Sequence, residues 1–432
     1  MKKQNDLGRD PVRPLVWRIA FPSMLAQFVS VLYSIVDRIY ISNIPVTGET
    51  ALAGVGVCGP VVTMLGAFAF LVGVGGAPLM SINMGAGRPD EARRILSNSF
   101  LVLCVCAIVL TAAVYPLRRP MLMFFGASEV TYPYADEYFS IYLAGTAFNL
   151  LSLGMNQFII CQGFAKKGMF SVVLGAALAT VISQLASCIY VLCVLFGKKV
   201  PVRIGFGGYS GKLIGRILLT GISPFLIIFV DSVMIISMNA VLQSYGGPEL
   251  GDRLITCATI AQSFMLVVTM PLGGISGGTQ TILAFNFGAH RRDRILEAQK
   301  HIMLLCVGYT ALMFAFARLG GGLFVRLFTT EAGLAEEALS AIRVCTLAII
   351  PLGVQYALVD GFTGMAQVKL ALPLSAWRKL VYFAALFWLP AAFGARAAFW
   401  AEPVSDILGP IASVSVYALC IKKLLDFPPA RP

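Results

Sequence analysis

Charge is the property in shortest supply in this sequence. Only 12% of its 432 residues are Asp, Glu, Lys or Arg, whereas a soluble domain carries roughly 25%. Hydrophobic residues make up 58% of the chain. A bilayer core about 30 Å thick needs about 20 apolar residues per helix, and windows of that kind recur from Pro14 almost to the C-terminus. The sequence therefore predicts an all-α, polytopic membrane protein without a large soluble domain.

Residues typical of metal sites and enzyme centres are also scarce. There are two histidines, His290 and His301, and the sequence contains no HExxH motif and no nucleophile elbow. The ten cysteines lie in or beside apolar runs without a CxxC pair, and a buried cysteine behaves as a small hydrophobic residue. The stretch "GFGGYSGK" lacks the spacing of a phosphate-binding loop. We therefore expect no metal site, no bound cofactor, and neither an ATP-driven pump nor a membrane enzyme.

Long apolar runs divide the chain into eleven expected membrane spans. They cover residues 14–42, 51–84, 95–116, 132–163, 168–196, 213–245, 254–287, 302–325, 339–367, 372–394 and 397–421.

An internal repeat relates the two halves of the chain. "RIAFPSML", with Pro22, matches "LTGISPFL", with Pro224, and the same offset of 202 pairs Asp37 with Asn239. One residue further on, "SINMGAGRPDEARRIL" matches "AFNFGAHRRDRIL". We therefore expect two homologous transmembrane bundles, about 1–205 and 206–432. Duplicated bundles are typical of secondary transporters, whose substrate site lies between the repeats.

The distribution of basic residues conflicts with the number of spans. The net charge of +12 comes from Lys and Arg in short loops, which favours the cytoplasmic excess that orients membrane helices over nucleic-acid binding. Residues 168–196 are long enough for one crossing. One crossing, however, would place every Lys- and Arg-rich loop of the second half outside the cell. An even number of crossings would keep all of these loops in the cytoplasm. The sequence resembles a twelve-span design with one span missing.

Several motifs, in order, resemble the multidrug and toxic compound extrusion (MATE) family, and in particular its bacterial DinF-like and MepA-like branch. They are "FPSMLAQFVSVLYSIVDRIYIS" (21–42), the repeated loops "NMGAGRPDEARR" and "NFGAHRRDR", "GAALATVISQ" (175–184), "LSAWRK" (374–379) and "FWAEPVSD" (399–406). The resemblance covers nearly the whole chain. It implies twelve spans in two six-span halves.

The resemblance also suggests which span is missing. The family's fifth span carries an Asn and an Asp shortly before the Gly-Ala-Ala motif of the sixth. Here no Asn or Asp lies between Lys167 and Thr180. The fifth span is therefore predicted to be deleted.

Ionisable residues inside spans indicate ion or substrate pathways because they are costly to bury there. Asp37 lies late in the first span beside Arg38; it is either an interfacial residue or, as the resemblance implies, the cation-coupling carboxylate. The resemblance adds the threonine of the sixth span, Thr180, to the same site. A carboxylate in a low-dielectric site can load a proton or bind a hard cation with neighbouring oxygens.

Three further polar residues are candidates for the pathway. Asp231 and Asp360 are intramembrane acids with apolar neighbours, and each is either functional or a hydrogen-bonded buried carboxyl. Asn239 is a neutral residue that could line the cavity or bond between helices.

The resemblance implies a monomeric antiporter of the cell membrane. It would export amphipathic, mostly cationic drugs by alternating access, driven by Na⁺ or H⁺ re-entry, without a cofactor or nucleic-acid partner. Two alternatives stay open. One is a lipid-linked saccharide flippase of the same superfamily, and the other is a non-transporting scaffold that has lost a coupling span.

Overall fold

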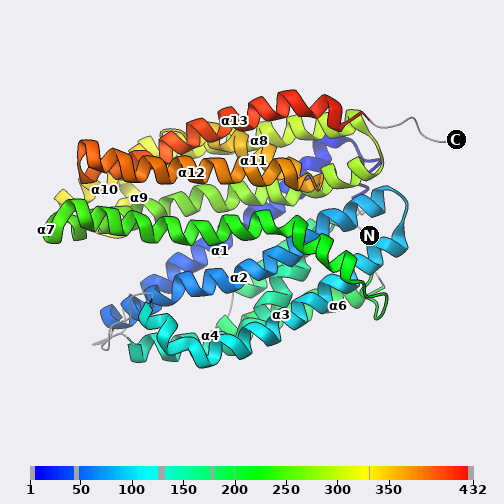
Figure 1. Cartoon of the computed structure of the whole chain (residues 1–432), viewed down its shortest axis with the longest axis horizontal. Coiled ribbons are helices and arrows are strands. Elements are labelled where there is room, and N and C mark those ends of the chain that lie inside the picture. Colours follow the sequence, from blue (N-terminus) through cyan, green and yellow to red (C-terminus); the bar gives the residue numbers. More distant parts are fainter. Residues whose placement is uncertain are drawn as a thin grey trace.

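The computed structural model describes residues 5–42, 48–124, 132–176, 180–198, 200–329 and 331–426, and for some helical residues it describes the backbone alone. Every regular element in these ranges is helical (Figure 1). The helices are α1 (Val12–Ser42), α2 (Gly48–Gly85), α3 (Pro89–Phe124), α4 (Tyr132–Ile160), α5 (Ala165–Ala176), α6 (Thr180–Phe196), α7 (Gly211–Gly288), α8 (Arg292–Leu319), α9 (Gly321–Val325), α10 (Ala332–Cys345), α11 (Ile349–Gly364), α12 (Val368–Phe393), η1 (Ala395–Trp400) and α13 (Ala401–Leu424).

Most of these helices can cross a membrane. Nine spans in the described residues are long and apolar enough, and α10 with α11, bent by 46°, forms a tenth. The long helix α7 supplies two of the nine, because its backbone leaves the helical conformation at Gly247 (φ 68°). The all-α, polytopic prediction is confirmed.

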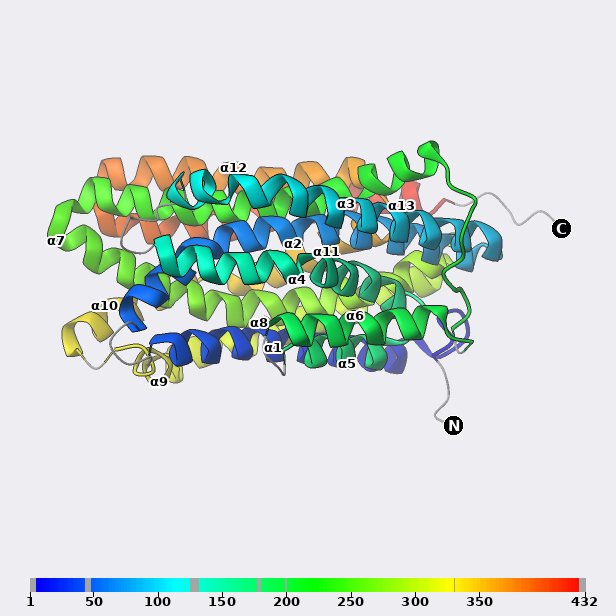
Figure 2. The same ribbon diagram turned by 90° about the horizontal axis from the view of Figure 1, so that it is seen from below.

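The stretch 168–196, counted above as one apolar run, is not a single helix in the described residues. This stretch forms two short helices, α5 and α6, which pack side by side (Figure 2). The hydroxyls of Ser171 on α5 and Ser187 on α6 lie 2.9 Å apart. A helix of 12 residues extends only about 18 Å, which is too short for a crossing of about 30 Å. Helices α5 and α6 therefore pair as a helical hairpin, and the hypothesis of a deleted fifth span stays a prediction.

The loop after α6 returns to the end of the molecule at which α3 begins. The amide of Gly205 donates to Ser97 Oγ at 3.1 Å, and the amide of Ser210 donates to Asn98 Oδ1 at 3.0 Å. Val202 and Ile204 are buried against the same end of α3. The basic residues at 198–216 thus lie beside those at 88–94.

We call this end of the molecule the basic end. It comprises the segment before α1, the α2–α3, α4–α5 and α7–α8 turns, and the loop after α6. The C-terminal end of α13 also lies there (Figure 1). Because Lys- and Arg-rich loops stay inside, we expect the basic end to face the cytoplasm, as the even-crossing interpretation requires.

The repeated Gly-Ala motifs of the two halves pack against each other at the basic end. A Cβ added to Gly85 would lie 1.9 Å from Phe285 O, and one added to Gly288 would lie 1.9 Å from Ile82 O. Glycine is therefore required at both positions, since any side chain would force the helices apart. We call α1–α6 the N-terminal bundle and α7–α13 the C-terminal bundle; the exact boundary at 205/206 stays a prediction.

A second set of contacts joins α2 to the start of α7. A Cβ on Gly221 would lie 1.7 Å from Leu71 O, and one on Gly75 would lie 2.3 Å from Ile217 O. The rings of Phe68 and Phe225 meet edge to face one turn further on. These positions belong to the cytoplasmic parts of α2 and α7, so the structure has the two bundles closed at the basic end.

Candidate functional site

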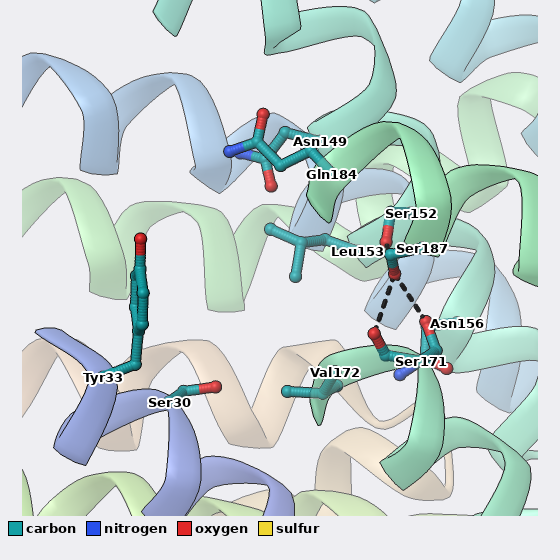
Figure 3. A pocket seen from close by; sticks show the side chains of 10 residues that line it. All are labelled: Ser30, Tyr33, Asn149, Ser152, Leu153, Asn156, Ser171, Val172, Gln184 and Ser187. Atoms are coloured by element: carbon teal, nitrogen blue, oxygen red, sulfur yellow. Dashed lines mark hydrogen bonds between the residues drawn. The ribbon is translucent and has the colours of Figure 1, made fainter. Parts of the chain in front are cut away.

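A polar cavity of about 180 Å³ lies inside the N-terminal bundle (Figure 3). It is bounded by α1, α4 and the α5–α6 hairpin. Its lining consists of Ser30, Tyr33, Asn149, Ser152, Leu153, Asn156, Ser171, Val172, Gln184 and Ser187. Eight of these ten side chains carry oxygen, and none is charged. Such a lining can accept hydrogen bonds or coordinate a cation with neutral oxygens.

Three serines at one side of the cavity hold the hairpin in place. Ser187 Oγ lies 2.6 Å from Ser152 Oγ on α4 and 2.9 Å from Ser171 Oγ on α5. All three side chains are buried. The cluster joins α4, α5 and α6, and because buried hydroxyls need partners, it fixes the register of the hairpin.

Two amide oxygens beside the cavity have no donor. Asn156 Oδ1 and Gln184 Oε1 are buried and make no hydrogen bond within the described residues. Leaving such acceptors unpaired costs free energy. A bound proton donor or a cation in the cavity would satisfy them.

The two residues predicted to couple a cation have side chains outside the described part of the structure. These are Asp37 and Thr180. Their helices, α1 and α6, both border the cavity.

Asp231 of α7 pairs with Lys379 of α12 in the C-terminal bundle. The Lys379 side chain is 7% exposed and that of Asp231 is 47% exposed. Exposed apolar residues of α7 lie on more than one face near this acid. Leu226, Phe229, Val233 and Ile236 are on the face opposite Asp231, whereas Ile235, which is 45% exposed, lies about 40° from it. Lys379 is thus the buried member of the pair, and Asp231 is the accessible one.

A second ion pair lies beside the first. Arg378 Nη1 donates to Asp406 Oδ1 at 2.9 Å, and the Asp406 side chain is fully buried. Glu402, one turn before Asp406 on α13, borders a small cavity between α7 and α10. The cluster thus contains three acids and two bases. Breaking a buried pair leaves an uncompensated charge, so α7, α12 and α13 are strongly tied together.

Sequence reasoning missed Arg378, Lys379, Glu402 and Asp406 as site residues. They occur in the motifs "LSAWRK" and "FWAEPVSD", whereas the candidates came only from acidic residues flanked by long apolar stretches. The detectable signal was a pair of bases inside the apolar run 372–394, since charges inside a span are costly whatever their sign.

Asp360 and Asn239, the remaining two candidates, take no part in the ion pairs of Asp231 and Asp406. Asp360 of α11 accepts a hydrogen bond from Ser276 Oγ of α7 at 2.5 Å. Asn239 is partly buried on α7, next to the buried Met238. The structure therefore gives Asp231 and Asp360 partners from other helices, and their roles stay predictions.

Comparison with known proteins decides the family. The model of the MatE family matches residues 22–185 and 227–385, one match in each half of the chain. This chain belongs to the MatE family. The two matched regions begin at Pro22 and three residues after Pro224, in agreement with the internal repeat.

Relatives of this MatE protein include two named "Multidrug export protein MepA". The protein from Staphylococcus haemolyticus (strain JCSC1435) is 21% identical over 436 residues, covering 94% of each chain. The protein from Staphylococcus aureus (strain MRSA252) is 22% identical over 444 residues, covering 96% of each chain.

Solved structures show the same fold. An outward-facing multidrug resistance MATE transporter of the MOP superfamily superposes with a TM-score of 0.90 at 19% identity, covering 99% of this chain and 100% of the other. A MOP superfamily transporter from Pyrococcus furiosus, described as having a binding pocket of reversed polarity, gives 0.90 at 20% identity over the same shares. At such identities the likeness concerns the fold alone.

Proposed function

We propose that this MatE protein is a secondary active efflux transporter of amphipathic, mostly cationic organic compounds. Its MepA relatives are named as multidrug export proteins. The two bundles meet through glycines at the basic end, which is the arrangement needed for rocking about a central site. We place the protein in the cell membrane as a monomer.

Entry of Na⁺ or H⁺ through the N-terminal bundle drives the export in this proposal. The observation that carries it is the oxygen-lined cavity with two unpaired amide acceptors. The described lining is neutral, and a carboxylate beside it would add a negative charge that favours a cation and a group that can load a proton. In this proposal Asp37 of α1 supplies the carboxylate and Thr180 of α6 supplies a hydroxyl.

Substrate charge is matched by acids in the C-terminal bundle. The Asp231 carboxylate is half-exposed, although it pairs with Lys379. Together with Glu402 and Asp406 it gives the cluster one more acid than base. This excess favours a positively charged substrate over the anionic headgroup that a lipid-linked saccharide flippase would carry.

One observation favours a non-transporting scaffold instead. The described lining of the cavity contains no acid, so loss of the Asn and Asp of the fifth span would remove most of the coupling groups. A scaffold would show no competition between the binding of a cationic drug and the binding of Na⁺ or H⁺.

Binding linkage tests the proposal. Tetraphenylphosphonium affinity of the purified protein is measured across a range of pH and Na⁺ concentrations. An antiporter binds substrate and coupling ion antagonistically, and the two effects are reciprocal. We expect one of the two ions to weaken binding at least tenfold, Asp37→Asn to abolish that dependence, and Asp90→Asn, at an exposed position, to retain it. Binding that is insensitive to both ions would overturn the coupling proposal.

A further inference from the structure

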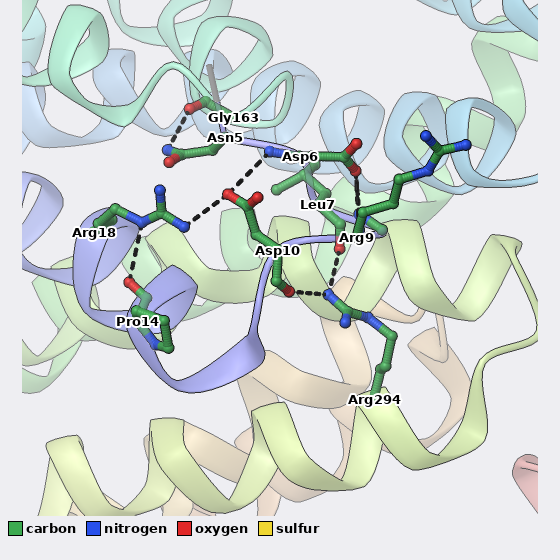
Figure 4. A network of polar contacts seen from close by, with 10 residues as sticks. Asn5, Asp6, Leu7, Arg9, Asp10, Pro14, Arg18, Gly163 and Arg294 are labelled. Carbon is green, nitrogen blue, oxygen red and sulfur yellow. Dashed lines mark hydrogen bonds and ion pairs between the residues drawn. The ribbon is translucent and has the colours of Figure 1, made fainter. Parts of the chain in front are cut away.

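The segment before α1 joins both bundles at the basic end (Figure 4). We define residues 5–10 as the strap. Asp6 Oδ1 accepts hydrogen bonds from the amides of Gly8 at 3.0 Å and Arg9 at 2.9 Å, and the Asp10 amide donates to Asp6 O at 3.0 Å. These local bonds hold the strap in a compact turn.

The C-terminal bundle holds the strap by its backbone carbonyls. Asn286 Nδ2 donates to Leu7 O at 3.0 Å, and Arg294 Nη2 donates to Leu7 O at 3.2 Å and to Asp10 O at 2.7 Å. Arg291 Nη1 donates to Gly8 O at 2.5 Å. These donors belong to the repeated "NFGAHRRDR" motif, so the α7–α8 turn binds the strap directly.

The N-terminal bundle holds the other side of the strap. Asn5 Nδ2 donates to Gly163 O at 3.0 Å, in the turn between α4 and α5. Gly163 has φ +85°, and a Cβ there would meet Asn5 O at 3.2 Å. The Leu7 side chain is 4% exposed and belongs to a buried cluster that includes Ala165 of α5 and Ile282 of α7.

We propose that the strap is a latch that stabilises the closed cytoplasmic end of the transporter. Its bonds to both bundles exist only while the α4–α5 turn and the α7–α8 turn are close together. Exposing the substrate site to the cytoplasm separates these turns, so the strap must release at least one of them. This inference rests on alternating access but not on the identity of the substrate or the coupling ion.

Spin-label distances across the basic end test the latch. Labels are placed at Arg88→Cys and Arg292→Cys, both exposed, after replacing the accessible cysteines 104, 106, 193 and 420. The protein is in lipid nanodiscs, without substrate. Asn5→Ala cuts the bond to the N-terminal bundle, and Arg294→Lys removes the forked contact to the strap, because lysine is a single point of charge.

Each of these two variants is expected to raise the ratio of long to short distances about two- to tenfold, the effect of losing one net hydrogen bond. Arg9→Ala, whose side chain is exposed, is the control and leaves the ratio unchanged. If Arg294→Lys does not fold, Arg291→Ala weakens the same attachment. A strap that merely travels with one bundle predicts that one attachment is dispensable, so an unchanged ratio in either variant overturns the latch. The linkage of ion and drug binding is measured separately, so its failure leaves this result interpretable.

Discussion

The amide of Val202 donates a hydrogen bond to Gln162 Oε1 at 2.8 Å. Gln162 ends the turn after α4, and Val202 follows α6, so the hairpin between them enters and leaves at one end of the molecule. Both residues are buried. A single crossing of residues 165–196 would separate them by about 30 Å. This contact therefore places the segment that leads into α7 at the same end of the molecule as the α4–α5 turn.

The hairpin predicts the sidedness of two loops. Reporter fusions within residues 205–210 and after Lys423 should both show a cytoplasmic location. A fusion at Gly247, where α7 breaks between its two spans, is the external control. An external reporter at 205–210 would contradict the hairpin.

The serine cluster predicts a stability loss when its centre is removed. Ser187→Val deprives Ser152 and Ser171 of their shared partner, and leaving buried hydroxyls unpaired costs roughly 1–3 kcal/mol. Thermal unfolding in detergent should show a clearly lower Tm. Ser415→Ala removes an exposed hydroxyl that bonds only within its own helix and should leave the Tm nearly unchanged. Equal Tm values for the two variants would mean that the cluster does not hold the hairpin.

The Asp231–Lys379 pair predicts unequal effects from its two members. Asp231→Asn leaves the 7% exposed lysine without its counter-charge, whereas Lys379→Met leaves a carboxylate that is 47% exposed and can be solvated. The first substitution should therefore lower the Tm more than the second, because an unpaired buried charge costs roughly 3–5 kcal/mol. Asp231→Asn combined with Lys379→Met should recover part of the loss in a double-mutant cycle. Additive losses would contradict a direct pair.

The glycine contact at the basic end predicts a specific transport defect. Gly288→Ala places a Cβ against Ile82 O and prevents full closure of the cytoplasmic end. Drug export by cells should fall at least tenfold, since closure on one side is required before opening on the other. Gly308→Ala, in open space on α8, is the matched control and should export normally. Normal export by Gly288→Ala, at equal membrane levels, would show that this contact is not needed.

The sequence predicted the membrane spans because each span is a local property of about 20 apolar residues. The loop charges correctly required an even number of crossings at 168–196, although length favoured one. The charge of a loop indicates on which side of the membrane the loop lies. The length of an apolar run indicates only whether one helix could cross the membrane.

The ion pairs and the strap could not be predicted in this way. Asp231 and Lys379 are 148 residues apart, so nothing near Asp231 indicates its partner. The C-terminal bundle holds the strap through the strap's backbone carbonyls, which every residue carries, so no side-chain pattern in residues 5–10 predicts that attachment. Both features depend on how the bundles pack.

Gradient-driven transport by the purified protein tests the central claim most directly. Liposomes containing the wild-type chain receive tetraphenylphosphonium on one side and an opposing Na⁺ or H⁺ gradient. The account predicts that one gradient drives the cation against its own concentration difference, that collapsing the gradient stops transport, and that Asp37→Asn is inactive. The absence of gradient-driven movement by folded wild-type protein would contradict the account and favour a scaffold.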